Sequence, residues 1–330
     1  MHSTMARLSL LALALALPCF TGCLAEDAAS SEQGEQEIGT AADALSVTQW
    51  SADKQVPGAR TLDAPAIAAF DGTAHMVHTG YDSNRLYHQI FDGTKWSTPA
   101  EIPGQYSKNR PALATMGTKG NYRLYMVHQG DTLDDLWWSV YDGVSWTKNE
   151  PLGLKSHAAP VMTSYNGKLY LFGATMILAG ETLIPSLYQA VYDGTTWGPL
   201  QVIQQSVDGA AVATHNGQLV LVTTSDHYLY MSTSTGNGWT QPRQIVGQKS
   251  KSAPALASYG GYLHMTHLGD TSNSIWWSTW DGASWATNVS IPGQQSRWAP
   301  SLANAGGKLF QAHIGGTNDT YASLFYSTFQ

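Results

Sequence analysis

The sequence predicts an all-β fold, a six-bladed β-propeller of four-stranded blades closed by an N-terminal strand that completes the last blade. Three observations predict it. A tryptophan recurs at intervals of one repeat, each repeat holds four strand-like runs, and the start of the folded region matches the piece missing from the last repeat. Only 12 % of the 330 residues are charged, against about 25 % in average proteins, which agrees with short apolar strands and tight turns.

The repeat is marked by one tryptophan that returns every 42 to 51 residues. These residues are Trp50, Trp96, Trp146, Trp197, Trp239 and Trp285. A period of this length with four strands per unit is typical of propeller blades. Because every blade needs the same packing, we interpret these tryptophans as structural.

Each unit divides into four runs of strand length. In the clearest copy, Ser252 to Gln294, they are a small apolar run from residue 254, an apolar run from 263, an aromatic run from 275, and a run that ends in Pro-Gly after a DGxxW turn. Such runs, bounded by Gly, Asp, Asn and Pro, predict strands, and residues 45–330 show no sustained helical period. The six first strands begin near Asp63, Asn109, His157, Val207, Ser252 and Trp298.

The two ends of the repeated region complement each other. The last unit stops after a third strand at Phe329. The region from Gln49 to Gly58 aligns with the sequence of a fourth strand, such as Ser284 to Gly293. We therefore expect the N-terminal strand to supply the outer strand of the last blade. This closure would remove an open sheet edge.

Residues 1–22 read as an export signal, with Arg7 before an apolar run that is too short to span a bilayer. Phe20 to Cys23 resembles a bacterial lipobox, which implies lipidation of Cys23; the alternative is an ordinary secretory signal. Residues 23–44 are poor in aromatics and predict a flexible tether, and 45–330 form the propeller. Cys19 would leave with the signal, so no disulfide is expected. The expected location is the outer membrane or cell surface.

The formal net charge is −7. This acidic balance argues against nucleic acid, because binding to it depends on neutralised phosphates. It also argues against electrostatic docking to anionic lipid, so membrane contact would come only from the anchor. We expect a monomer.

Histidines recur at the end of the second strand: His78, His128, His267 and His313. In blades two and five they begin a fuller motif, in which Asp131 and Trp138, or Asp270 and Trp277, follow. One interpretation is a sugar pocket, because imidazole and carboxylate bind hydroxyls and an indole covers an apolar sugar face. The other is structural: the histidine bonds a carbonyl, the aspartate caps a turn, and the tryptophans pack between blades.

Loops that lead into first strands carry a Gln-x-Ser pattern, with Gln105, Gln248 and Gln294. Each glutamine would lie beside the rim of a neighbouring blade, where a ligand between blades would sit. Solvated loop polarity is the alternative interpretation.

The repeat resembles the fucose-binding β-propeller lectins of insect-pathogenic Photorhabdus. The shared pattern is a Pro-Ala-rich first strand, an apolar second strand, and Leu-Tyr-His followed by Asp-Gly-x-x-Trp, seen here from Leu86 to Trp96. The resemblance covers residues 45–330. It implies glycan partners, fucosylated ones included, bound in shallow pockets between blades. Those lectins have seven blades, whereas six are counted here.

Enzyme motifs are nearly absent: there is no GxSxG, Walker or HExxH pattern, and no metal or cofactor is expected. His264 and His267 face opposite sides of one strand and cannot share a metal ion. We therefore expect a glycan-binding lipoprotein with no catalytic residue. The alternatives are a scaffold that docks a protein partner and a glycoside hydrolase, which would need one unique catalytic cluster.

Overall fold

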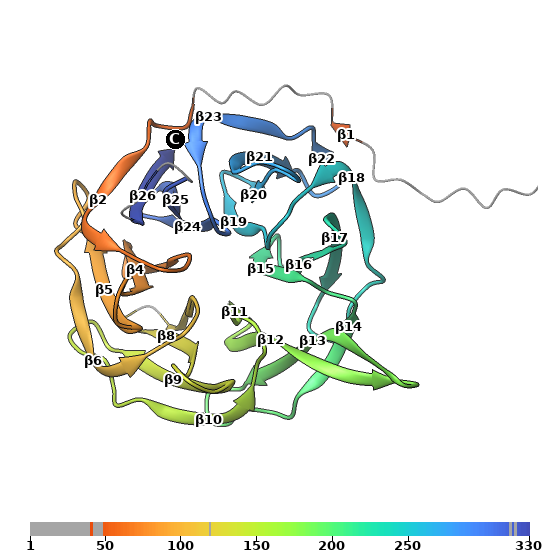
Figure 1. Cartoon of the computed structure of the whole chain (residues 1–330), viewed down its shortest axis with the longest axis horizontal. Coiled ribbons are helices and arrows are strands. Elements are labelled where there is room, and N and C mark those ends of the chain that lie inside the picture. Colours follow the sequence, from red (N-terminus) through yellow and green to blue (C-terminus); the bar gives the residue numbers. More distant parts are fainter. Residues whose placement is uncertain (1–39, 42–48, 119, 317–318, 320–321) are drawn as a thin grey trace, which may run out of the picture. The chain divides into compact units, whose positions relative to one another are not determined.

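The computed structural model describes residues 40–41, 49–118, 120–316, 319 and 322–330. Nearly all of them lie in strands or turns, and the unit Glu37–Gln330 forms a six-bladed β-propeller of four-stranded antiparallel blades (Figure 1). The predicted fold class and blade count are confirmed. The signal, Cys23 and the tether lie outside the described residues, except for Thr40–Ala41. In the described part of the chain, no helix is long and apolar enough to cross a membrane.

Each blade runs from an inner to an outer strand, and the bounds follow in that order. Blade one is β3 (Ala66–Phe70), β4 (Thr73–Thr79), β5 (Arg85–Phe91) and β6 (Ala100–Tyr106). Blade two is β7 (Ala112–Thr118), β8 (Asn121–Gln129), β9 (Asp135–Tyr141) and β10 (Glu150–Lys155). Blade three is β11 (Val161–Tyr165), β12 (Lys168–Ala179), β13 (Thr182–Tyr192) and β14 (Gln201–Gln205).

Blade four is β15 (Gly209–His215), β16 (Gln218–Ser225), β17 (Tyr228–Ser234) and β18 (Arg243–Lys249). Blade five is β19 (Ala255–Tyr259), β20 (Tyr262–Leu268), β21 (Ser274–Trp280) and β23 (Val289–Gln295), and the short β22 (Trp285–Ala286) pairs with β21 and with β1 (Thr40–Ala41). Blade six is β24 (Ser301–Ala305), β25 (Lys308–Ile314), β26 (Ser323–Phe329) and β2 (Lys54–Arg60).

The ring closes through its N-terminal strand, as predicted. Strand β2 lies beside β26 (Figure 1) and pairs antiparallel with it. Lys54 is opposite Tyr326, and Trp50 forms a bridge with Phe329. Ser51 N also donates a hydrogen bond to Thr328 O at 2.8 Å. The outer strand of the last blade therefore comes from the start of the folded region, and the sheet edge is covered.

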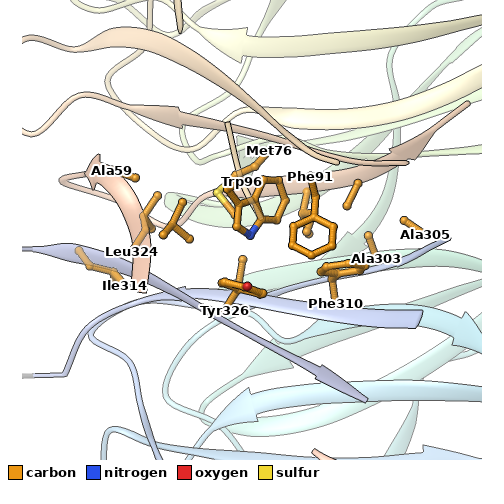
Figure 2. Close-up of a cluster of buried hydrophobic side chains, with 14 of the residues drawn as sticks. Ala59, Met76, Phe91, Trp96, Ala303, Ala305, Phe310, Ile314, Leu324 and Tyr326 are labelled. Atoms are coloured by element: carbon orange, nitrogen blue, oxygen red, sulfur yellow. The ribbon is translucent and has the colours of Figure 1, made fainter. Parts of the chain in front are cut away.

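The apolar core lies between blades rather than at one centre. Six clusters of buried side chains are found in the described residues, and each joins two neighbouring blades. Figure 2 shows the cluster at the closure, where Met76 and Phe91 of blade one pack against Phe310 and Tyr326 of blade six. Since the two blades come from opposite ends of the chain, this layer depends on the completed ring.

Each recurring tryptophan packs against the preceding blade. Trp96 lies 5.9 Å from Tyr326 between ring centroids, and Trp285 Nε1 points at Met231 Sδ of blade four. In the DGxxW turn before it, the aspartate accepts two main-chain N–H bonds, as Asp142 does from Val144 and Ser145. The motif therefore builds the boundaries between blades, which supports the structural interpretation.

Candidate functional site

The four recurring histidines are buried and occupy equivalent places. Each is the cross-strand partner of an aromatic residue in the third strand. The pairs are His78–Tyr87, His128–Trp137, His267–Trp276 and His313–Phe325. In every case Nδ1 lies 2.8 to 3.2 Å from the carbonyl oxygen of the next residue, to which it donates. This local bond fixes the orientation of each imidazole ring at the end of its strand.

The second ring nitrogen faces the residue that precedes the outer strand of the same blade. His128 Nε2 lies 3.1 Å from Asn149 Oδ1, and His313 Nε2 lies 3.1 Å from both carboxylate oxygens of Asp53. In blade five the partner is the Asn288 amide, at 3.3 Å from His267. Blade one has Pro99 there, and His78 Nε2 has no hydrogen-bond partner in the part of the chain that the structure describes.

Burial favours the neutral form of three of these imidazoles. Desolvation lowers the pKa of His78 and that of His267 to about 4, against an ordinary value of 6.5, and it lowers the pKa of His128 as well. A neutral ring with Nδ1–H donating leaves Nε2 as an acceptor. His78 therefore presents a buried lone pair for a donor such as a hydroxyl.

Blade three lacks this histidine for a steric reason. It has Gly173 in that place, and a Cβ there would lie 2.3 Å from the hydroxyl oxygen of Tyr188, the cross-strand partner. The phenol fills the space of the imidazole. In blade four, Thr223 accepts a hydrogen bond from Gln204 at 3.0 Å. The hydrogen bond in blade four therefore runs to β14, the outer strand of blade three.

The three glutamines expected at ligand sites are buried, with 2 to 3 % of their surface exposed. Gln105 accepts a hydrogen bond from Ser139 at 2.9 Å, and Gln248 donates to Ser278 at 3.0 Å. Gln294 links blade five to Ser51 of blade six. Each amide joins the outer strand of one blade to the next blade. Their burial and these bonds give the glutamines a structural role between blades, and neither solvated loop polarity nor an open ligand contact describes their placement.

The tryptophans predicted to cover a sugar also pack against neighbouring aromatic side chains. Trp277 is 1 % exposed and donates from Nε1 to His264 at 3.1 Å. Trp138 is half-buried and packs on Tyr125 and Trp197. The preceding residue of each pair, Trp137 or Trp276, shares a face with the recurring histidine instead. The first member of each Trp-Trp pair therefore faces the same side of the blade as the histidine, and the predicted second member faces the other side.

A pocket of about 440 Å³ lies between blades one and two. Its floor includes Trp137 and Asn149, and Asp131 stands at its side. The opposite wall is the outer strand of blade one, with Gly104 and Tyr106. Asp131 makes no hydrogen bond or ion pair with the described residues, so its carboxylate is open to a ligand.

A second pocket of about 260 Å³ lies between blades six and one. Tyr87 takes the place of Trp137, and its ring stacks on His78 with centroids 5.7 Å apart. The guanidinium of Arg60 lies 4.3 Å over the ring of Tyr81. Gly58 of β2 forms part of the opposite wall. The closure strand thus contributes to a candidate site as well as to stability.

The two pockets are built from equivalent positions. Gly58 and Gly104 both have a φ of +70° and lie in the irregular stretch where the outer strand shifts register, which bends the strand away and leaves room beneath. On the floor, a Cβ on Gly130 would lie 3.3 Å from Trp137 Nε1, and one on Gly80 would lie 2.9 Å from the ring of Tyr87. The motif glycine therefore lets the aromatic ring lie against the backbone.

Asp270 in blade five has a different environment. Its carboxylate is in hydrogen-bond contact with His227 Nδ1 and lies 3.9 Å from Lys249 Nζ. Both partners belong to blade four. This aspartate is therefore tied to the neighbouring blade, whereas Asp131 is open.

Sequence reasoning missed Trp137, Tyr87, Arg60 and Tyr81. Strict alternation from the paired histidine would have identified Trp137, because directly opposed residues in antiparallel strands share a face. Arg60 and Tyr81 had no such signal, since they meet only when the ring closes. In the described residues, no group of three or more His, Cys, Asp or Glu side chains could hold a metal ion.

No family and no curated protein matches the chain by sequence. Solved propellers match its fold. The SapL1 lectin in complex with alpha methyl fucoside has 11 % identity and a TM-score of 0.59, over 84 % of this chain and 94 % of that one. The fucose-specific lectin from Aleuria aurantia has 14 % identity and a TM-score of 0.57, over 82 % and 96 %.

Sialidases share the fold too. Hadza microbial sialidase Hz136 has 12 % identity and a TM-score of 0.63 over 81 % of this chain. The chain spans only 65 % of that sialidase and 55 % of the Trypanosoma rangeli sialidase, which it matches with 15 % identity and a TM-score of 0.58. At these identities the comparisons show the propeller fold alone.

Proposed function

We propose that this protein binds glycans, with one sugar residue seated in each of the two pockets that flank blade one. The observation that carries the proposal is the repeated construction of these pockets. Each is lined by an aromatic residue that pairs across strands with a buried histidine, and by an outer-strand glycine of the preceding blade. Equivalent pockets are what a multivalent binder needs, whereas an enzyme needs one unique site.

The chemistry of the pockets suits a sugar. An aromatic ring covers the apolar C–H face of a pyranose, while Asp131 in one pocket and the free Nε2 of His78 in the other accept hydroxyl protons. Each such hydrogen bond contributes about 0.5–1.5 kcal/mol. Single sites should therefore be weak, and binding strength should come from engaging both.

The fold comparisons support glycan binding and suggest a first ligand. Two of the propellers that match this chain are fucose lectins, one of them in complex with alpha methyl fucoside. We therefore choose methyl α-fucoside as the first probe, after a glycan array that samples other sugars. The array also decides whether the pockets prefer a different neutral sugar.

The test counts sites. Titration calorimetry of the purified protein with the sugar should give two sites, and Trp137→Ala or Tyr87→Ala should each reduce the count to one. Val144→Ala is the matched control, because Val144 is 88 % exposed in a turn of blade two and lines neither pocket. Two sites remaining in either pocket variant, with an unchanged melting temperature, would contradict the proposal.

We also propose that Cys23 carries the lipid that holds the protein at the outer membrane or cell surface. The support is the lipobox-like run from Phe20 to Cys23 after an apolar segment. Cys23→Ser should move the protein from the membrane fraction to the soluble fraction and should remove the lipid mass. Unchanged fractionation and mass would contradict it.

One feature favours the second candidate, a scaffold that docks a protein. The β12–β13 hairpin extends beyond its blade (Figure 1) and exposes Leu178 and Leu183, 70 % and 59 % accessible. Paired exposed leucines are typical of contact surfaces. A glycan array without any positive sugar, from a correctly folded protein, would favour this function.

A further inference from the structure

The loops that enter the six inner strands are built alike. In five of them a Ser or Thr hydroxyl donates to the carbonyl oxygen two residues later, as Ser107 does to Asn109 and Ser296 does to Trp298. The loops can therefore be compared position by position. The residues after this carbonyl position are Ala64, Arg110, Ala159, Gly209, Ala253 and Ala299.

Arg110 is the exception in this set. Five blades have alanine or glycine where the loop turns into the inner strand, and blade two has an arginine. A repeated scaffold needs no arginine at one of six equivalent places. The carbonyl position itself also has an exception, because Trp298 stands where the other blades have Asp63, Asn109, Ala158, Asp208 and Ser252.

These two exceptions line one cavity. A space of about 180 Å³ opens at the mouth of the central channel, and all six blades contribute to its wall. Arg110 and Trp298 both border it, together with Asp63, Asp208 and Ser252. Arg110 also borders the channel below, between the inner strands. Trp298 is 51 % exposed, which leaves an indole face available to a ligand.

The guanidinium of Arg110 has no hydrogen-bond acceptor among the described residues. Only its main-chain nitrogen forms a hydrogen bond, donated to Asp63 at 2.7 Å, and its side chain makes no hydrogen bond or ion pair with the described residues. Burial lowers the pKa of Arg110, while the nearby Asp63 carboxylate raises it. The guanidinium is therefore a partly buried cation whose donors are available to a ligand.

The other basic side chains of these loops all have partners away from the channel. Lys108 and His157 bind Asp134, at 2.5 and 2.7 Å. Lys251 donates to Asn273, and Arg297 donates to the carbonyl oxygen of Gly316 at 3.2 Å. Arg110 alone among them borders the cavity.

The surrounding charges select the ligand. Asp63 is held by the main-chain N–H groups of Ala64 and Arg110, and Asp208 accepts one from Asp226. Two carboxylates around one guanidinium disfavour a dianion but leave a planar site for one carboxylate. The same two aspartates can accept hydroxyl protons.

We propose that the mouth of the central channel binds a single carboxylate-bearing sugar of the hexuronate type. Arg110 holds its carboxylate, Asp63 and Asp208 accept its hydroxyls, and Trp298 covers its apolar face. This site differs from the pockets between blades in place and in ligand charge. That the ligand is a sugar rests on the proposed function; that it carries a carboxylate rests on Arg110 itself.

The test uses D-glucuronate, with D-glucose, acetate and glucose 6-phosphate as comparison ligands, in titration calorimetry and ligand-observed NMR. Glucuronate should bind at least tenfold more tightly than the other three. Arg110→Ala should weaken it at least tenfold with little change in melting temperature, since five blades already have a small residue there. Trp298→Ser, which copies blade five, should weaken it less, and Lys251→Ala is the basic-residue control that should change nothing.

The proposed sugar pockets between blades and the proposed site at the channel mouth can be disproved independently. Trp137→Ala combined with Tyr87→Ala should remove fucoside binding and leave glucuronate binding intact. Acetate as tight as glucuronate would overturn the sugar class, and glucose 6-phosphate as tight as glucuronate would overturn the choice of a monoanion. Glucuronate binding that survives Arg110→Ala would overturn the site.

Discussion

Blades two and five carry almost the same motif, yet the structure gives the two copies different surroundings. In blade two, Asp131 is open and lines a pocket with Trp137. In blade five, Asp270 is tied to His227 and Lys249 of the preceding blade. The counterparts of those two residues in blade one are Asn84 and Tyr106, which leave Asp131 open.

This difference teaches that a site between blades belongs to two repeats at once. The motif supplies the floor and the carboxylate, and the preceding blade decides whether they stay accessible. Repetition of a motif within one blade therefore does not imply repetition of a site. The same reasoning explains why blade one, without the full motif, still has a pocket on each side.

The largest expected difference between the two blades is in stability. Trp277→Ala should destabilise the protein by about 3–5 kcal/mol, because Trp277 is 1 % exposed and packs against Trp50 and Phe329 of blade six. Trp138→Ala should destabilise it by only ~1–3 kcal/mol, since Trp138 is half-buried. Denaturant unfolding measures both. Equal losses of stability would show that Trp138 and Trp277 contribute equally to the packing between blades.

A second prediction concerns what the two blades share. His267 has a folded-state pKa of about 4 because of burial, below the ordinary 6.5, so the unfolded chain binds its proton first. The free energy of unfolding should therefore fall as pH drops from about 6.5 to 4, by up to ~1.4 kcal/mol per pH unit for each such histidine. Four further buried histidines add to this loss: His75, His78, His88 and His264.

Variants at His128 and His267 sharpen that prediction. His128→Asn and His267→Asn should each make the pH dependence shallower by a similar amount, because both rings are fully buried. Denaturant midpoints at pH 7, 5.5 and 4.5 measure the slope. A shallower pH dependence in only one of the two variants would show that His128 and His267 also differ in their environments.

The smallest predicted change in stability belongs to the most direct test of the difference between blades two and five. Giving blade four the residues of blade one, His227→Asn with Lys249→Tyr, should free Asp270 and add a third sugar site over Trp276. The cost in stability should be small, about 0–1 kcal/mol, because both ion-pair partners are more than two-fifths exposed. Asp270→Ala added to this double variant is the control and should return the count to two.

Calorimetric stoichiometry decides this prediction. A count that stays at two in a folded double variant would contradict the idea that the preceding blade closes the site. The same titration on Asp131→Ala should show the loss of the blade-two site, and single Asp270→Ala in the otherwise unchanged protein should lose none.

The sequence by itself determined the fold of this protein. Six blades were predicted from the recurring tryptophans and the four runs per repeat. Their closure was predicted from the match between Gln49–Gly58 and the fourth-strand sequence of other repeats. The structure confirms both. Such features are local and repeated, and each blade solves the same packing problem. Their physical causes, strand alternation, turn chemistry and aromatic packing, act within about fifty residues.

Only the tertiary structure decided where ligands could bind. It placed Gln105, Gln248 and Gln294 in the contacts between blades, buried Trp277, and brought Arg60 of β2 against Tyr81. It also gathered Arg110 and Trp298, 188 positions apart in the sequence, around one channel mouth. A pocket is formed by side chains from separate repeats, so its shape and charge depend on which blades meet, and no single repeat carries that information.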